Sequence, residues 1–322
     1  MKVFALALLV ACGATPPPPP PPAPADNFGV EIAGDRITRI TPANVTLWPS
    51  IVDSHVHLAY WPVGDQLAKT GIGAVVDLAA PSINTSSSLH VISSGPMLTK
   101  PDGYPLESWG RDGYGIGCSY ALCVEAEIQK IVKQGARVIK IALDDSGLDP
   151  SLLAIAVKAA HAENMKVAVH ALSDRSALLA AQAGADILAH TPVEPLRAET
   201  IAAWKGRAVI STLAAFGGTD AAIANLRALR EAGVTVLYGT DLGNLRDAGP
   251  SAAEVALLSR AGLDNAAIVD AMTTTPARFW NLPFGAISVG GEATFLVLDR
   301  DPRTDVRTLL SPRAVYLRGK RM

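Results

Sequence analysis

The feature that most constrains the fold of this chain is an alternation that starts near residue 50. Short apolar runs rich in β-branched residues alternate there with Ala- and Leu-rich stretches. Such an alternation is typical of βα units around a parallel sheet. Eight runs read as strands, at 51–57, 73–79, 90–95, 138–143, 166–171, 186–191, 208–213 and 235–241. With a helix after each strand, the pattern predicts a closed (β/α)₈ TIM barrel over residues 50–282.

The helices between these strands are clearest in four places, and several end at a glycine. They lie at 123–134, 150–164, 174–183 and 220–232. The main competing fold is an open, doubly wound sheet. That fold normally has a glycine-rich phosphate loop after its first strand, where this chain has a pair of histidines. The histidines therefore favour the barrel.

Two further segments flank the barrel. Residues 28–49 contain short runs around Gly34-Asp35, and residues 283–322 contain apolar runs at 295–298 and 314–317. We expect the two ends to pair into one small composite β-sandwich. Inside the barrel, residues 97–117 are expected to form a long loop after the third strand, and loops of that length are usually functional or disordered.

The first 27 residues have a composition of their own. Lys2 and the apolar run 3–10 precede Leu9-Val10-Ala11-Cys12, which resembles the lipobox of bacterial lipoproteins. We expect residues 1–12 to be a lipoprotein signal peptide with Cys12 lipidated, and the proline-rich residues 13–27 to form an extended tether. The protein would then sit on the periplasmic face of a bacterial membrane, with the outer membrane as the default. An ordinary secretory signal is the alternative.

The charge and hydropathy of the chain limit the kinds of partner that we expect it to bind. A formal net charge of −2 gives no reason to expect a nucleic-acid partner. No apolar run reaches the roughly 18–20 residues of a membrane-spanning helix, so membrane contact is expected only through the lipid anchor. The expected partner is therefore a small-molecule substrate, and the sequence leaves open whether the protein forms a homo-oligomer.

In an exported chain Cys118 and Cys123 could form a disulfide, if a turn lies between them, or stay as two thiols.

Candidate metal ligands begin with His55-Val56-His57 in the first strand. Residues two apart in a strand point to the same face, so both imidazoles should project to one side. Other polar residues end or interrupt later apolar strands, where barrel active sites lie. These residues are Lys140, His170, His190 and Asp241. Their spacing places the six side chains on strands 1, 4, 5, 6 and 8, which predicts a metal site.

With these residues in place, the chain resembles the amidohydrolase superfamily over about residues 29–322, in the subtype with two metals bridged by a carboxylated lysine. The tail Gly290-Gly291-Glu292-Ala293-Thr294 is similar to a family motif, with Thr294 where Asp is common, and Ser50 replaces a usual Gly. The runs at 74–79 and 94–96 are closer to the imidazolonepropionase-like and Xaa-dipeptidase-like branch.

The resemblance implies a ligand set and a reaction. His55, His57 and Asp241 would hold a buried metal, His170 and His190 an outer one, and Lys140 would bridge them as its N-carboxylate. Two divalent ions, most simply zinc, would activate a bridging hydroxide. Asp241 would move the proton from that hydroxide to the leaving group.

These residues imply a metal-dependent amidohydrolase that cleaves the C–N bond of a dipeptide, an N-acyl amino acid or a cyclic amide. Two alternatives stay open. One is an esterase, lactonase or phosphotriesterase on the same metals, and the other is a non-catalytic binding lipoprotein.

Substrate-binding residues are sought in the loops at the predicted mouth. Arginine is the side chain best shaped to grip a carboxylate in two places, and Arg246 and Arg111 lie in loops of this kind. Tyr104, Trp109 and Tyr114 could wall the same pocket and favour an apolar or aromatic substrate group. The substrate is therefore expected to carry a carboxylate beside the scissile amide.

Overall fold

The computed structural model describes residues 28–83, 88–144 and 146–322. The predicted signal peptide, Cys12 and the proline-rich tether lie outside the described residues. In the part of the chain that is described, no helix combines the length and the apolar character needed to cross a membrane.

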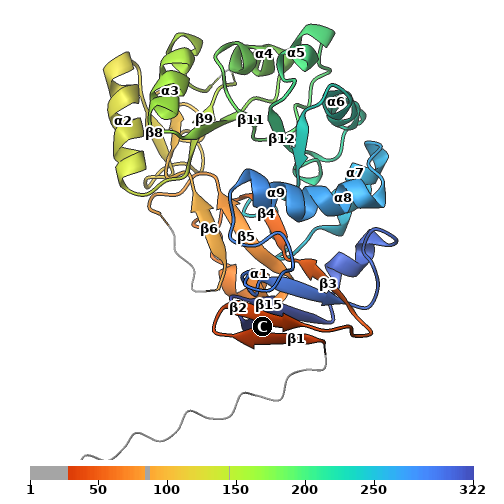
Figure 1. Cartoon of the computed structure of the whole chain (residues 1–322). Helices are drawn as coiled ribbons and strands as arrows, with labels where there is room; N and C mark the ends of the chain where they lie inside the picture. The colour runs from red at the N-terminus through yellow and green to blue at the C-terminus, as the bar shows by residue number, and fades with distance from the viewer. Residues whose placement is uncertain (1–27, 84–87, 145) are drawn as a thin grey trace, which may run out of the picture.

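A ring of parallel strands forms the centre of the molecule (Figure 1). Its strands are β4 (Ile51–Val56), β5 (Ile72–Asp77), β6 (His90–Ser93), β7 (Met97–Thr99), β9 (Val138–Ala142), β10 (Lys166–His170), β11 (Ile187–Leu188), β12 (Ala208–Ile210) and β13 (Thr235–Leu237). The Arg137 N–H donates to the Ser93 carbonyl at 3.0 Å and so joins β9 to β6. The Asp241 N–H donates to the His55 carbonyl at 2.8 Å and closes the ring. The predicted TIM-type barrel is confirmed.

The third barrel strand is divided, and the predicted loop 97–117 is shorter than expected. After β6 the chain turns at Gly95, whose φ is +64°, and continues as β7. The segment β8 (Gly115–Gly117) then pairs in parallel with β7. The prediction was wrong at both ends of the loop, where β7 and β8 form. β8 escaped prediction because two glycines in three residues give it little strand propensity of its own. The loop therefore covers residues 100–114.

Helices form the outer layer of the barrel (Figure 1). They are α1 (Gly64–Lys69), α2 (Ala121–Lys133), α3 (Pro150–Ala162), α4 (Asp174–Gln182), α5 (Ala198–Ala203), α6 (Asp220–Glu231), α7 (Ala252–Arg260), α8 (Asn265–Met272) and α9 (Thr274–Phe279), with 3₁₀ turns η1 (Ala214–Phe216) and η2 (Val306–Leu310). Side chains of Asp149, Ser173 and Thr219 cap the first turns of α3, α4 and α6.

One expected helix is missing from the described residues. Between β5 and β6 they contain no helix, although we expected one after each strand. The sequence of this connection is rich in Ser, Thr, Asn and Pro, which compete with or interrupt helical hydrogen bonding.

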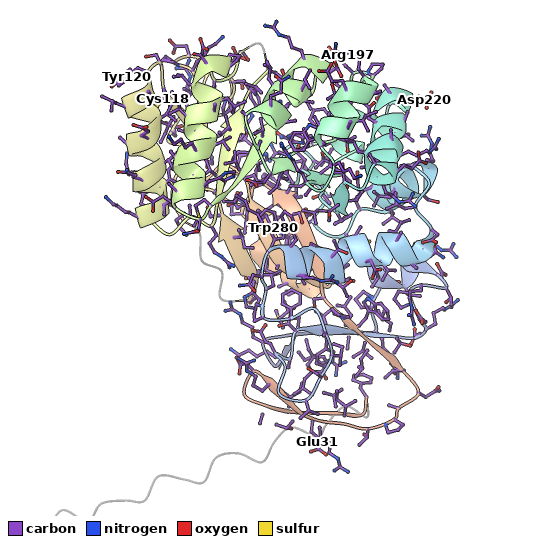
Figure 2. The ribbon with its side chains drawn as sticks, turned by 45° about the horizontal axis from the view of Figure 1, so that its top comes forward. Glu31, Cys118, Tyr120, Arg197, Asp220 and Trp280 are labelled. Atoms are coloured by element: carbon purple, nitrogen blue, oxygen red, sulfur yellow. A yellow bond between two sulfur atoms is a disulfide. The ribbon has the colours of Figure 1, made fainter. Side chains whose placement is uncertain are left out.

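The barrel strands separate two apolar layers. In β9, Val138 belongs to the interior cluster, whereas Ile139 and Ile141 pack in the outer cluster against the helices. Trp280, at the end of α9, packs into the interior cluster, and its indole N–H donates to Ser54 Oγ at 3.1 Å (Figure 2). Polar side chains on the interior positions of the strands are therefore surrounded by apolar groups.

Both ends of the chain build a β-sandwich beside the barrel (Figure 1). Its strands are β1 (Val30–Ala33), β2 (Arg36–Ile40), β3 (Thr46–Pro49), β14 (Phe295–Leu298), β15 (Ala314–Leu317) and β16 (Lys320–Arg321). β1 and β2 form one antiparallel sheet, and the second has the order β16-β15-β14-β3. Ile37 packs with Phe295 and Val297 in a core shared by the two sheets. The composite sandwich is confirmed.

Cys118 and Cys123 form a disulfide with a Cα–Cα distance of 5.6 Å. Cys118 directly follows β8, and a bend at Tyr120 leads the chain into α2, so that Cys118 lies next to the first turn of that helix (Figure 2). Of the two alternatives left open by the sequence, the disulfide is the one that the structure contains.

Candidate metal centre

Four imidazoles gather at the carboxyl ends of the barrel strands. The ring centroids of His55 and His190 lie 4.4 Å apart, those of His170 and His190 4.8 Å, and those of His55 and His57 5.2 Å. His55 lies in β4, His57 directly follows that strand, His170 ends β10, and His190 follows β11. The structure therefore brings together the four histidines that the sequence singled out.

A bulge in β4 aims the first pair into the barrel. Between Asp53 and Val56 the register against β5 shifts. Val56 lies three residues after Asp53 in β4, but its partner in β5 lies only two residues after the partner of Asp53. Val52 accordingly packs in the interior cluster, whereas Val56 packs in the outer one. The extra residue changes which alternate positions face inward, and His55 and His57 then share the interior side.

Asp241 joins this pair of histidines. Its Oδ1 lies 3.0 Å from His57 Nε2 and 3.5 Å from His55 Nε2, and ligand atoms of the three residues all fall within 4.8 Å of one another. The backbone of Asp241 is left-handed, with φ of +59°, a conformation that Asp tolerates better than most residues. Asn244 Nδ2 donates to both carboxylate oxygens at 3.1 Å and fixes their orientation.

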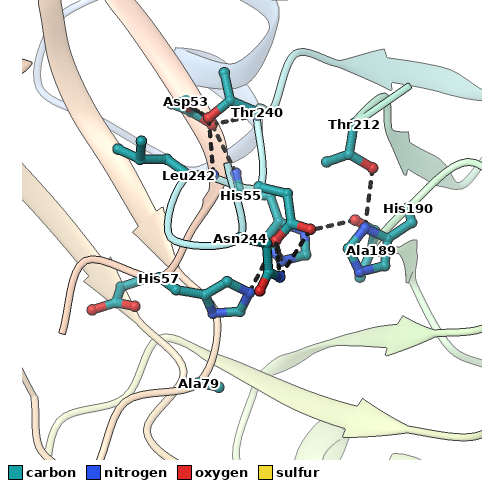
Figure 3. Close-up of polar contacts among 12 residues, drawn as sticks. Asp53, His55, His57, Ala79, Ala189, His190, Thr212, Thr240, Leu242 and Asn244 are labelled. Atoms are coloured by element: carbon teal, nitrogen blue, oxygen red, sulfur yellow. Dashed lines mark hydrogen bonds and ion pairs between the residues drawn. The ribbon is translucent and has the colours of Figure 1, made fainter. Parts of the chain in front are cut away.

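Hydrogen bonds orient the rings of two histidines, and the bond made by His55 also selects which of its ring nitrogens is free. His55 Nδ1 lies 2.8 Å from the Ala189 carbonyl oxygen, and His190 Nδ1 lies 3.0 Å from Thr212 Oγ1 (Figure 3). A carbonyl can only accept, so His55 Nδ1 carries the hydrogen and Nε2 keeps its lone pair. Contacts of this kind orient histidines that bind metals.

Burial keeps the imidazoles of His55, His170 and His190 neutral. Burial, and then the nearby charge of Lys140, lower the pKa of His170 to about 3 and that of His55 well below its ordinary value. Burial and then His55 do the same to the pKa of His190. Neutral imidazole is the form that binds a metal.

Asp241 is held in its charged form. Burial raises its pKa, but the electrostatic interaction with the His55 ring and the hydrogen bonds from His57 and Asn244 outweigh burial and hold the pKa below its ordinary value. At neutral pH the centre therefore combines the neutral imidazoles of His55, His170 and His190 with an ionised oxygen ligand.

The amine of Lys140 has no hydrogen-bond partner among the described residues. The side chain is completely buried, between Val138 and Ala142 on β9. Burial lowers the pKa of Lys140 to about 7, against a smaller opposing effect of Asp241. A substantial fraction of this amine is therefore neutral at pH 7 and has a lone pair.

Unsatisfied polar atoms concentrate at this centre. Among the described residues six buried side-chain atoms lack a hydrogen-bond partner, and three of them are His55 Nε2, His57 Nδ1 and Lys140 Nζ. Each such atom costs about 1–3 kcal/mol when it is left unpaired. Their concentration, together with the donor set of imidazole nitrogens and a carboxylate, fits a divalent metal such as zinc.

Two buried aspartates that the sequence did not single out support the ligands. Asp53 accepts hydrogen bonds from the His55 N–H at 3.2 Å and from Thr240 Oγ1 at 2.6 Å, and so links the bulge to the segment that carries Asp241. Asp77 accepts from the Leu58 N–H at 3.1 Å, directly after the histidine pair. An acidic residue inside an apolar strand was the available signal for both.

The aromatic residues of the 100–114 loop stand next to the histidines. Trp109 lies 4.8 Å from His57 and Tyr104 lies 4.8 Å from His170, measured between ring centroids. Trp109 Nε1 donates to the Tyr104 hydroxyl at 3.4 Å. Tyr114 adjoins Trp109 at 6.0 Å, as does Tyr60, which the sequence did not single out, at 5.5 Å.

The two arginines singled out from the sequence lie farther out. The Arg246 guanidinium stacks over the ring of Trp61 at 4.2 Å and that of Tyr60 at 5.5 Å, and its side chain is exposed. Arg246 therefore stacks on the two aromatic residues whose N–H groups donate to the His57 carbonyl, Tyr60 at 3.1 Å and Trp61 at 2.8 Å. Arg111 is exposed, and its side chain contacts none of the histidines in the described structure.

Fold and centre together define a class: TIM-type barrels with metal-ligand side chains at the carboxyl ends of their strands. Residues 46–322 match the model of the amidohydrolase family. The chain belongs to the amidohydrolase family.

Known proteins are similar over most of the chain. An uncharacterized protein of Mycobacterium tuberculosis is 26% identical, with 84% of each chain covered. Among solved structures, an Xaa-Pro dipeptidase with bound methionine has a TM-score of 0.76 and 17% identity, covering 90% of this chain and 93% of the other. A. niger ochratoxinase has a TM-score of 0.71 and 21% identity, covering 90% of each chain. These structural likenesses show a common fold.

Proposed function

We propose that this protein is a metal-dependent hydrolase that cleaves the C–N amide bond of a small molecule, namely a dipeptide, an N-acyl amino acid or a cyclic amide. The buried centre carries the proposal, because it combines neutral imidazoles and an ionised Asp241 with an unpartnered lysine amine. Membership of the amidohydrolase family supports it. So does the fold shared with a protein named as an Xaa-Pro dipeptidase.

The residues would divide between two ions. His55, His57 and Asp241 would hold the inner ion, and His170 and His190 the outer one. Lys140 would lie between them as an N-carboxylate, which forms when its neutral amine adds CO₂ and releases a proton. When bound, two divalent ions supply a hydroxide nucleophile at neutral pH and polarise the scissile carbonyl.

The protein's own groups would then act in sequence. Asp241 accepts the proton of the nucleophile and delivers it to the leaving nitrogen, while Asn244 keeps the carboxylate in place. Tyr104 has its pKa raised to about 12, mainly by burial, so its hydroxyl stays protonated and can donate a hydrogen bond to the substrate. Trp109 covers His57 and excludes water from that side.

A substrate panel tests the amide specificity. With zinc-loaded protein we expect kcat/KM for a dipeptide or an N-acyl amino acid to exceed that for a lactone or a phosphotriester by about 10²-fold or more, a difference of about 2.7 kcal/mol in transition-state binding. Faster turnover of the lactone or the phosphotriester would replace the amidase by the esterase alternative. If no substrate is turned over at full zinc occupancy, the remaining alternative is a non-catalytic binding lipoprotein.

We also propose that the protein is attached to the periplasmic face of a bacterial membrane through a lipid on Cys12. The Cys12→Ser variant should move from the membrane fraction to the soluble fraction, or accumulate unprocessed, because a thioether-linked lipid cannot form on serine. Fractionation followed by immunoblotting measures this. Membrane association that is unchanged in Cys12→Ser would remove the lipid anchor from the proposal.

A further inference from the structure

A pocket of about 490 Å³ opens beside the centre. His170, Tyr104 and Ala142 line one part of it, and Arg175 and Glu194 line another. His170 and Tyr104 also belong to the histidine cluster and its aromatic wall. A substrate that reaches the outer metal position can therefore extend into this pocket.

Arg175 is an unneutralised cation in this pocket. It lies in the first turn of α4, its side chain is exposed, and in the described residues it has neither an ion pair nor a hydrogen bond from its guanidinium. The carboxylate of the adjacent Asp174 already accepts hydrogen bonds from Arg197 Nε at 2.6 Å and from the Thr200 hydroxyl at 2.7 Å. Asp174 therefore does not neutralise Arg175.

Asp144, the acidic residue of the pocket beside His170, already accepts hydrogen bonds. Asp144 accepts hydrogen bonds from the Leu172 N–H at 3.0 Å and the Ser173 N–H at 3.4 Å, and it faces His170 Nε2 at 3.4 Å. Glu194 is exposed and its carboxylate has no such partner in the described chain. Among the described residues that line the pocket, Arg175 is thus a guanidinium and Glu194 a carboxylate without a side-chain partner, and Asp144 adds a hydrogen-bonded carboxylate beside His170.

We propose that Arg175 binds the carboxylate of the substrate, and that the substrates are amides with one free carboxylate. The proposal rests on the proposed function, because it takes His170 as part of the catalytic centre. A guanidinium can hold a carboxylate through two parallel hydrogen bonds. Arg175 lines a pocket that reaches His170, whereas Arg246 is stacked on Trp61. Glu194 would repel a second negative charge and so limit the substrates to monocarboxylates.

A matched pair of ligands tests this assignment. N-acetyl-L-phenylalanine and its C-terminal amide share the scissile bond and the aromatic group but differ in the carboxylate. For the acid, Arg175→Met should raise KM, and the calorimetric Kd, by roughly 10- to 100-fold, which is the range of a charged hydrogen bond. The amide should be almost unaffected and so shows that the variant is folded. Arg175→Lys should give a smaller loss, because it keeps the charge without the two-pronged geometry.

Two further variants distinguish the effect of a charge inside the pocket from the effect of a charge elsewhere on the surface. Glu194→Gln should tighten binding of the acid, the opposite direction to Arg175→Met. Lys158→Met, which removes an exposed positive charge from α3 outside the pocket, should leave the preference for the acid unchanged. Equal losses for acid and amide in Arg175→Met would overturn the assignment, as would a selective loss in Arg246→Met in its place.

The outcomes also distinguish this inference from the proposed function. If wild-type protein hydrolyses the acid without dependence on Arg175, the inference fails and the amidase proposal stands. If it hydrolyses neither ligand but binds the acid through Arg175, the hydrolase proposal fails and the carboxylate site stands.

Discussion

Elemental analysis of active protein should find about two divalent ions per chain, and loss of either ion should abolish activity. The ligands are prepared for this, because His55, His170 and His190 are neutral and three buried polar atoms at the centre have no hydrogen-bond partner in the described part of the chain. His55→Ala and His170→Ala should each lower kcat/KM by about 10³-fold or more, since without a metal no hydroxide is available at neutral pH. Steady-state kinetics and mass spectrometry of the metal content measure both effects.

His161→Ala is the matched control for these substitutions. His161 lies on α3, where its Nε2 lies 2.9 Å from the Asp186 carboxylate, and it is exposed. This variant should keep both ions and nearly full activity. At most one ion per chain in active protein prepared with bicarbonate would contradict the two-metal centre.

Lys140→Ala should be inactive and should recover part of its activity with short carboxylic acids. Lys140 is buried, its amine bonds to none of the described residues and its pKa is lowered to about 7, the conditions under which an amine can add CO₂. Loss of the bridging oxygens should cost about 10³-fold or more in kcat/KM, because the ions would lose a shared ligand. Acetate or propionate can enter the space left by the side chain and supply two oxygens.

Lys166→Ala provides the comparison, because Lys166 is an exposed lysine at the start of the neighbouring strand β10. It should retain activity and show no response to acetate. Full activity of Lys140→Ala in the absence of added acid would exclude a bridging role for this lysine.

Much of the centre was predictable because polar residues in apolar strands are costly unless they have a function. Lys140 in Val138-Ile139-Lys140-Ile141-Ala142 is the clearest case, and the βα spacing placed it with the histidines. The bulge in β4 was not predictable, since the sequence 51–57 also fits a regular strand. Nothing in that sequence fixes its register against β5.

The substrate-facing residues were harder to predict for a related reason. Arg246 follows Asp241 closely in sequence, yet its guanidinium packs on Trp61. Arg175 follows His170 just as closely but lines the pocket. Which of the two reaches the substrate depends on how each loop leaves its strand, and sequence distance from a ligand does not report that direction. The division of the third strand at Gly95 escaped prediction because it depends on pairing with β9 and β8.

The pairing of β3 with β14 also governs when the chain can finish folding. Trp48 lies opposite Leu296, so a strand made early in synthesis waits for a partner made near the end. Until then β3 presents an unpaired edge, and the apolar face of the β1–β2 hairpin has nothing to cover it. An intermediate that lacks β14 therefore offers this edge to intermolecular strand pairing.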